Sequence, residues 1–109
     1  DIFVLASRQE PFGLALSEAR EAGCAIVASD VDGIPEVLDG GNAGQLVRCG
    51  DAEALSRALS SLLQSRQDLE AWKVRAQTNL DWLRVERVHQ ETLGVYQTAI
   101  AEMTRTVCA

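Results

Sequence analysis

The sequence predicts an α/β fold, a partial Rossmann-like parallel sheet of about three strands with a helical carboxyl-terminal tail. Short apolar runs of strand length occur at residues 2–6, 25–28 and 45–49, separated by glycine-containing loops. Between the first two runs apolar residues recur at helical spacing, and strands joined by such helical crossovers run parallel. After residue 50 apolar residues recur every three or four positions, which predicts that residues 51–109 are helical.

The first half of the chain alternates strands and helices. Residues 2–6 form a continuous apolar run with β-branched side chains, the pattern of a strand covered on both faces. Residues 7–13 are predicted as a loop. The next helix has Gly23 at its carboxyl-terminal cap and an apolar stripe of Phe12, Ala15, Leu16, Ala19 and Ala22. A buried strand at 25–28, a loop at 29–44 with a short helix near Pro35, and a strand at 45–49 follow.

The second half contains three predicted helices. Asp51 is a good N-cap for the first helix, whose apolar stripe consists of Leu55, Ala58, Leu59, Leu62 and Leu63. The second helix carries Leu69, Trp72, Ala76 and Leu80. The third is about twenty residues long and carries Val85, Val88, Thr92, Val95, Tyr96, Ala99, Ile100 and Met103. We therefore divide the chain into an α/β part, residues 1–50, and the helices that complete the same domain, residues 51–109.

Composition excludes several classes of protein. The chain has 109 residues, of which 47% are apolar and 24% charged, as in ordinary globular domains. Its net charge of -6 argues against binding nucleic acid, and no apolar run approaches the roughly 18 residues of a membrane helix. Cys24, Cys49 and Cys108 form no C-x-x-C pair, and His89 is alone, so we expect a reduced, cytoplasmic chain without a metal site. Because Asp1 directly precedes an apolar strand, we expect a piece of a larger domain.

Two glutamates mark the candidate site. Ligands of open parallel sheets bind beyond the carboxyl ends of the strands, where the loops at 7–13 and 29–44 emerge. Glu10 lies in the first loop and Glu18 inside the following helix, with seven residues between them. The helix N-terminus offers N–H groups to a phosphate, and Gly13 lets a ligand approach the backbone. Glu18 can reach back to a ribose diol, and Glu10 to a second sugar, as in a nucleotide-diphosphate sugar.

Other interpretations of these residues remain open. Isolated carboxylates on helices and loops are usually solvated, so Glu10 and Glu18 can be plain surface residues. A hydrolase with paired carboxylates fits poorly, because both glutamates belong to one loop–helix unit. Neither Ser7 nor Ser17 lies in a nucleophile elbow, and the chain has no dinucleotide-binding or Walker motif.

A family resemblance rests on several motifs together. The first are Asp1–Ser7 and Glu10-x-Phe12-Gly13-Leu14-x-x-x-Glu18-Ala19. Further matches are Ala22-Gly23, Ile26–Ser29, Gly33–Glu36, Asn42-x-Gly44, Leu46-Val47, Gly50-Asp51-x-x-Ala54-Leu55 and, in the tail, Trp82, Val88 and Tyr96. Over nearly the whole chain these residues resemble the retaining glycosyltransferases of the GT-B fold, the group one glycosyl transferases. The resemblance implies the carboxyl-terminal half of a nucleotide-sugar-binding domain, residues 1–50 with the two-glutamate motif and residues 51–109 as its final helices.

The resemblance also implies roles for the site residues. Glu10 is the implied catalytic residue and contacts hydroxyls of the transferred sugar. The amides of Phe12, Gly13 and Leu14 lie near the donor, and Glu18 binds the nucleotide ribose. No metal cofactor is implied, because protein charges and helix dipoles stabilise the leaving diphosphate. The implied partners are a nucleotide-diphosphate sugar, an acceptor glycan, lipid or small molecule, and an amino-terminal domain that this sequence lacks, which holds the acceptor site.

Two positions depart from the family pattern. Asp32-Gly33 replaces a usual Gly-Gly, and we expect the Asp32 side chain to face solvent. Arg20 replaces a common Met, and we expect it on the exposed side of its helix. A sugar-nucleotide epimerase of the same architecture and a non-catalytic nucleotide-binding module remain alternatives. We expect the full-length parent to be cytoplasmic, with peripheral attachment to a membrane left open, and the isolated chain to be inactive.

Overall fold

A computed structural model describes residues 1–108 and contains a parallel three-stranded sheet. Its strands are β1 (Ile2–Leu5), β2 (Ala25–Ser29) and β3 (Gln45–Val47), arranged in the order β1-β2-β3. Phe3 of β1 lies opposite Ile26 of β2, and Ala28 of β2 lies opposite Leu46 of β3. The α/β fold with a parallel sheet is therefore confirmed, with β2 central and fully buried.

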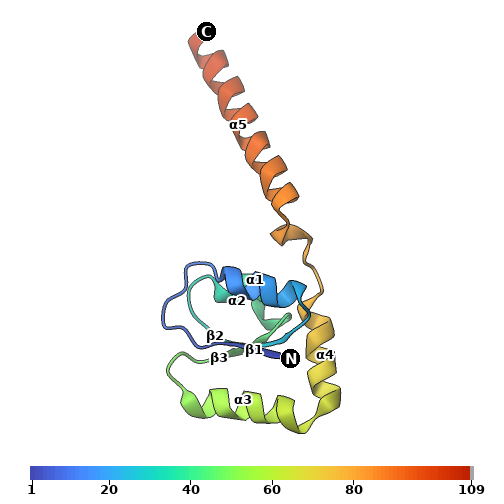
Figure 1. The fold of residues 1–109 in the computed structure, drawn as a ribbon. Coiled ribbons are helices and arrows are strands. Elements are labelled where there is room, and N and C mark those ends of the chain that lie inside the picture. Colours follow the sequence, from blue (N-terminus) through green and yellow to red (C-terminus); the bar gives the residue numbers. More distant parts are fainter. Residues whose placement is uncertain (109) are drawn as a thin grey trace. The chain divides into compact units, whose positions relative to one another are not determined.

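Five α-helices accompany the sheet in the described part of the chain (Figure 1). They are α1 (Leu14–Glu21), α2 (Ile34–Val37), α3 (Ala52–Gln64), α4 (Arg66–Ala76) and α5 (Val85–Cys108), with 3₁₀ turns at Asp39–Gly41 and Asp81–Leu83. The chain forms two compact units, Asp1–Thr78 and Asn79–Ala109. The first unit therefore contains the sheet together with α1 to α4. The division of the domain at residue 50 stays a prediction.

The first unit has one apolar cluster on each face of the sheet. α1 and α2 lie on one face and α3 on the other (Figure 1). On the α1 face, Leu16 and Ile34 pack on Ile26 and Ala28 of β2. On the α3 face, Leu62 packs with Ala25 and Val27, the alternate residues of the same strand. α4 joins the two layers, because its Leu69 and Trp72 pack in the second cluster and its Ala76 in the first.

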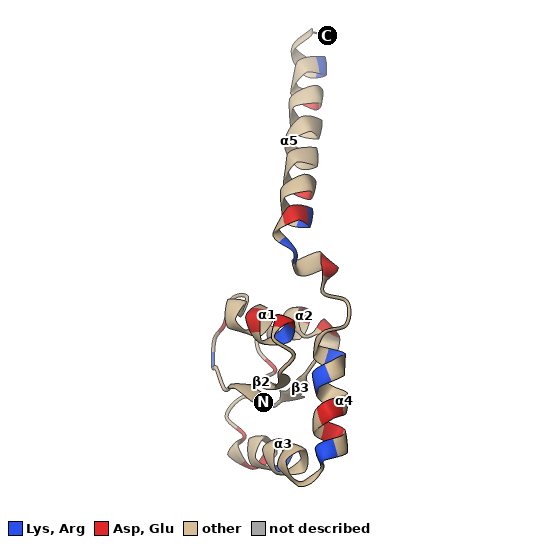
Figure 2. Ribbon diagram, turned by 45° about the vertical axis from the view of Figure 1, so that its right-hand side comes forward, with Lys and Arg blue, Asp and Glu red and all other residues tan. Residues whose placement is uncertain are grey.

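Local signals explain where several helices begin and end. Asp51 caps α3, its Oδ1 accepting a hydrogen bond from the Ala54 N–H at 2.9 Å, as predicted. Ser65 caps α4 in the same way through Asp68 N–H. Gly23 follows α1 with a φ of +72°, the left-handed conformation that ends many helices. Acidic and basic residues are mixed along the exposed face of α4 (Figure 2), where Glu70 and Lys73 form an ion pair of 3.5 Å.

Three expectations about apolar positions are wrong. β1 is only partly covered, because its Val4 is 40% exposed. In the predicted stripe before β2, Leu16 and Ala19 are buried, but Phe12, Ala15 and Ala22 are exposed. The buried face of α1 is therefore narrow. In the predicted stripe of α3, Leu62 is buried, but its neighbour Leu63 is 75% exposed.

Arg20 contradicts its predicted exposure most clearly, because the structure buries it completely. Its Nε donates to the Ala76 carbonyl at 2.9 Å and its Nη1 to the Val37 carbonyl at 2.7 Å, while Nη2 donates to the Thr78 carbonyl. These carbonyls lie at or just beyond the carboxyl ends of α2 and α4, where helices leave C=O groups without intrahelical donors. The guanidinium therefore closes both helix ends with one side chain. Burial lowers the pKa of Arg20, opposed by the nearby Asp39 carboxylate.

The second unit consists of a 3₁₀ turn and the long helix α5. α5 has 24 residues, as the periodicity of the third helix predicts, and buries none of them. Its threonines, among them Thr92 and Thr98, donate their hydroxyls to carbonyls four residues earlier in the helix. Within residues 1–108, no helix combines the length and the apolar character that crossing a membrane requires.

Candidate functional site

The candidate site lies at the carboxyl edge of the sheet. Three loops emerge there, after Leu5 of β1, Ser29 of β2 and Val47 of β3. The loops after β1 and β3 touch, because the Cys49 thiol donates to the Ser7 carbonyl at 3.7 Å. They enclose an open cleft of about 210 Å³ lined by Ala6, Ser7, Arg8, Ser29, Val47, Arg48, Cys49, Gly50, Asp51, Ala52 and Leu55.

Glu10 is held at three points in the loop that follows β1. Its backbone N–H donates to Asp32 Oδ2 at 2.9 Å, and its carbonyl accepts from Gly33 N–H at 3.3 Å. Its own carboxylate oxygen Oε1 accepts from the Gly13 N–H at 3.1 Å. The side chain of Glu10 is therefore directed at the beginning of α1.

Gly33 allows the loops after β1 and β2 to pack against each other. A Cβ at this position would lie 2.2 Å from the carbonyl oxygen of Pro11, closer than any side chain can approach. Asp32 beside it has a φ of +47°, a left-handed conformation that Asp tolerates better than most residues. Asp32 is exposed, as expected, yet its carboxylate has a definite partner in the Glu10 N–H. The departure from Gly-Gly therefore introduces a hydrogen bond between the two loops.

The N-terminus of α1 begins at Gly13, which is buried and has a φ of +85°. No side chain caps this helix end, and within its first turn the Leu16 N–H donates to the Gly13 carbonyl at 2.9 Å. The N–H groups of Leu14 and Ala15 are therefore the ones left for another acceptor. Gly13 also permits tight packing, since an added Cβ would lie 3.1 Å from Leu16 Cδ1. On either side, Phe12 is 38% and Leu14 70% exposed. The arrangement is an open, positively polarised helix end beside the Glu10 carboxylate.

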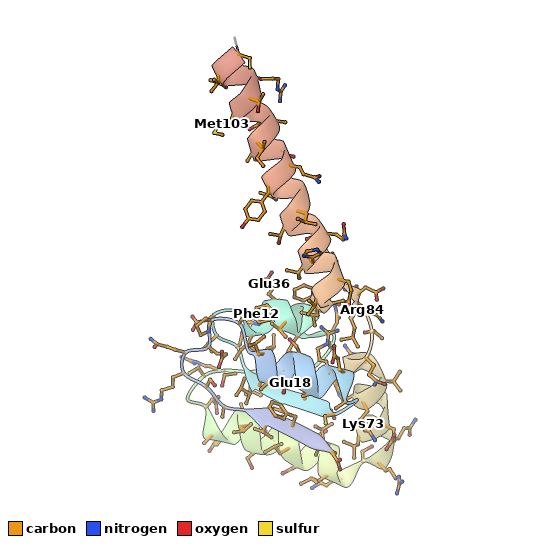
Figure 3. The ribbon with its side chains drawn as sticks, turned by 45° about the horizontal axis from the view of Figure 1, so that its top comes forward. Phe12, Glu18, Glu36, Lys73, Arg84 and Met103 are labelled. Atoms are coloured by element: carbon orange, nitrogen blue, oxygen red, sulfur yellow. The ribbon has the colours of Figure 1, made fainter. Side chains whose placement is uncertain are left out.

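Glu18 is exposed on α1, in the second turn of the helix (Figure 3). The same short helix thus carries Gly13 at its start, Glu18 on its exposed side and the buried Arg20 on its covered side. Glu10, Phe12, Gly13 and Leu14 all belong to the loop and first turn of this loop–helix unit. Whether these five residues bind a donor stays a prediction.

Sequence reasoning missed the hydrogen-bond partners of two residues in this unit, Glu10 and Arg20. The hydrogen bond from Glu10 to Asp32 joins residues 22 apart, and those of Arg20 reach 17 to 58 residues along the chain. The dipeptide Asp32-Gly33 was a usable signal, because Asp before Gly is typical of turns with positive φ. Arg20 offered no such local signal. Among residues 1–108, no group of three or more His, Cys, Asp or Glu side chains is placed to hold a metal ion.

Comparison with known proteins places the chain among transferases. The family described as glycosyl transferases group 1 matches residues 1–79, which nearly coincides with the first compact unit. The chain is 38% identical to a phosphatidyl-myo-inositol mannosyltransferase of Mycolicibacterium smegmatis over 90% of its own length and 23% of the relative's. It is 34% identical to an alpha-maltose-1-phosphate synthase of the same organism, over 92% of its length and 28% of the relative's.

A solved structure agrees with these relatives. Sucrose-phosphate synthase from Thermosynechococcus elongatus superposes with a TM-score of 0.83 and 26% identity, over 93% of this chain and 26% of that one. The fold is thus part of the GT-B architecture, as predicted. The chain spans about a quarter of the length of the relatives that it matches.

Proposed function

The chain belongs to the group 1 glycosyl transferases, and on that premise we propose that the complete protein transfers a sugar from a nucleotide-diphosphate donor to an acceptor with retention. The observation that carries this proposal is the loop–helix unit Glu10–Glu21 within the matched residues 1–79. It joins an uncapped helix N-terminus to a carboxylate that is held beside it. The unit thus places donors suited to a phosphate beside an acceptor suited to sugar hydroxyls.

In this proposal the start of α1 receives the diphosphate. The N–H groups of Leu14 and Ala15 donate to phosphate oxygens, and the helix dipole adds a partial positive charge. When the bond between the anomeric carbon and the diphosphate oxygen breaks, negative charge grows on the leaving group. These fixed dipoles stabilise that charge more in the transition state than in the bound donor. A bond from the acceptor hydroxyl oxygen to the anomeric carbon replaces the broken one on the same face of the sugar, as retention requires. The hydroxyl proton passes to the leaving diphosphate oxygen.

Glu10 is the proposed catalytic residue, because it touches the transferred sugar. Its Oε1 accepts from the Gly13 N–H, and in this proposal its second oxygen, Oε2, accepts from a hydroxyl of the donor sugar. A carboxylate there accepts hydrogen bonds from sugar hydroxyls and fixes the ring for reaction at the anomeric carbon.

Glu18 is the proposed ribose ligand. A carboxylate with two oxygens can accept both hydrogens of a vicinal diol, and helical side chains lean toward the N-terminus, where the phosphates lie. No metal is part of the proposal. Further cationic groups and the acceptor site are proposed to come from the amino-terminal part of the complete protein. We also propose that the complete protein is cytoplasmic.

The test compares Glu10→Gln, Glu18→Gln and, as matched control on the exposed side of α1, Glu21→Gln in the complete protein. The donors are UDP-glucose, ADP-glucose and GDP-mannose, each assayed with and without acceptor. We expect Glu10→Gln to lower kcat by about 100-fold or more and Glu18→Gln to raise the donor KM by about tenfold, the loss of one charged hydrogen bond. Glu21→Gln should leave both constants unchanged.

Four results would contradict the proposal. Unaltered kinetics in both site variants would remove the assigned roles. Isomerisation of the donor without acceptor would favour the epimerase alternative. A complete protein that neither binds nor turns over any of the three donors would favour a non-catalytic module. Full activity in excess EDTA is expected, and its loss would contradict the metal-free mechanism.

A further inference from the structure

The Glu10 loop is anchored by a residue outside the two-glutamate motif. Asp32, in the loop after β2, accepts the Glu10 N–H through Oδ2 at 2.9 Å. We propose that Asp32 is a positioning residue that sets the orientation of the Glu10 carboxylate, an inference that rests on the proposed function. Asp32 itself touches neither sugar nor phosphate in this proposal and acts through Glu10.

The geometry around Glu10 supports this role. The carbonyl of Glu10 accepts from Gly33 N–H at 3.3 Å, so Asp32 and Gly33 hold the N–H and C=O of the same residue. The third contact, from Gly13 N–H to Oε1, fixes the end of the side chain. Without the Asp32 carboxylate, the Glu10 N–H loses its acceptor, and only the contacts with Gly33 and Gly13 remain to orient the Glu10 carboxylate. Displacements of about 1 Å are enough to change reaction rates strongly.

The identity of residue 32 matters for two separate reasons. Its φ of +47° favours Gly, Asn or Asp, because other side chains are strained in the left-handed region. The hydrogen bond requires an acceptor, which Asp and Asn have and Gly lacks. Asp32→Gly therefore keeps the backbone conformation and removes the acceptor, whereas Asp32→Asn keeps both. Because Asp32 is exposed, water can replace the lost bond to Glu10 N–H, and the glycine variant is expected to fold.

The contact itself is tested by hydrogen exchange of the complete protein, followed by mass spectrometry of the peptide that contains Glu10. Asp32→Gly should raise its exchange rate, and Asp32→Asn should not. The kinetic test uses the fastest donor among UDP-glucose, ADP-glucose and GDP-mannose. Asp32→Gly is expected to lower kcat on the order of tenfold with little change in donor KM, and Asp32→Asn to stay within about twofold of the unaltered protein.

The double variant Glu10→Gln/Asp32→Gly separates positioning from a general structural role. If Asp32 acts through Glu10, the double variant is no slower than Glu10→Gln alone, whereas independent defects multiply. Asn79→Gly is the matched control and should leave kcat unchanged, since Asn79 is also exposed and also has a positive φ, +52°.

Each outcome has one meaning. Normal kcat in Asp32→Gly, or unchanged exchange at Glu10, overturns the positioning role. So does a slow Asp32→Asn variant that still protects the Glu10 amide, because a charge effect would then be responsible. If Glu10→Gln keeps full activity, the proposed function fails instead, while the exchange experiment still decides whether Asp32 holds the loop.

Discussion

α1 and α5 have similar patterns of apolar residues but opposite surroundings. α1 has eight residues and buries Leu16, Ala19 and Arg20. α5 has 24 residues and buries none. In α1, the buried face packs on β2, and its Arg20 donates hydrogen bonds to backbone carbonyls that are distant in the sequence. Helical periodicity thus indicates which residues share a face, but only the neighbouring elements decide whether that face is covered.

The largest expected effect concerns Arg20 in α1. Arg20→Ala removes the donors of three carbonyls and a large buried side chain, so we expect the free energy of unfolding to fall by about 3–5 kcal/mol. Urea denaturation of the 109-residue chain measures it. Arg20→Lys, which keeps the charge but not the planar fork, should recover only part of the loss. If the urea midpoint of Arg20→Ala is unchanged, the Arg20 side chain contributes no stability, and packing would distinguish α1 from α5 no better than exposure does.

Leucine and isoleucine truncations compare the two helices directly. Leu16→Ala in α1 creates a cavity in the cluster on β2 and should cost about 2–5 kcal/mol. Ile100→Ala in α5, where Ile100 is 60% exposed, should change stability by less than about 0.5 kcal/mol. The same denaturation experiment measures both. Equal losses would show that α5 buries this side of the helix in solution.

Alanine substitutions at two glycines should change stability in opposite directions. Gly33→Ala would place a Cβ 2.2 Å from the Pro11 carbonyl and should destabilise the chain by about 1–3 kcal/mol. Gly94 lies inside α5 with nothing within 4 Å of an added Cβ, so Gly94→Ala should stabilise the helix by about 0.5–1 kcal/mol. Helicity and thermal midpoint by circular dichroism measure the two effects. A tolerated Gly33→Ala would contradict the tight packing of the two loops.

Much of the fold was predictable because its signals are local. The three strands, the cap at Asp51 and the glycine after α1 follow from short stretches of sequence. The site was predictable to the extent that Glu10, Gly13 and Glu18 belong to one loop–helix unit. What sequence could not give is set by contacts over long separations. The burial of Arg20 and the hydrogen bond from Glu10 to Asp32 both depend on partners that periodicity cannot identify.

The hydrogen bonds of Arg20 also constrain the order in which the chain folds. The acceptor carbonyls of Ala76 and Thr78 lie 56 and 58 residues after it, among the most distant partners in the first unit. Contacts over such separations form late, because the loop between them must first be closed. Until α4 is in place, α1 carries an unpaired charge on the face that must enter the core. We therefore expect substitutions of Arg20 to accelerate unfolding far more than they slow folding, so that this one side chain governs the kinetic lifetime of the whole sheet.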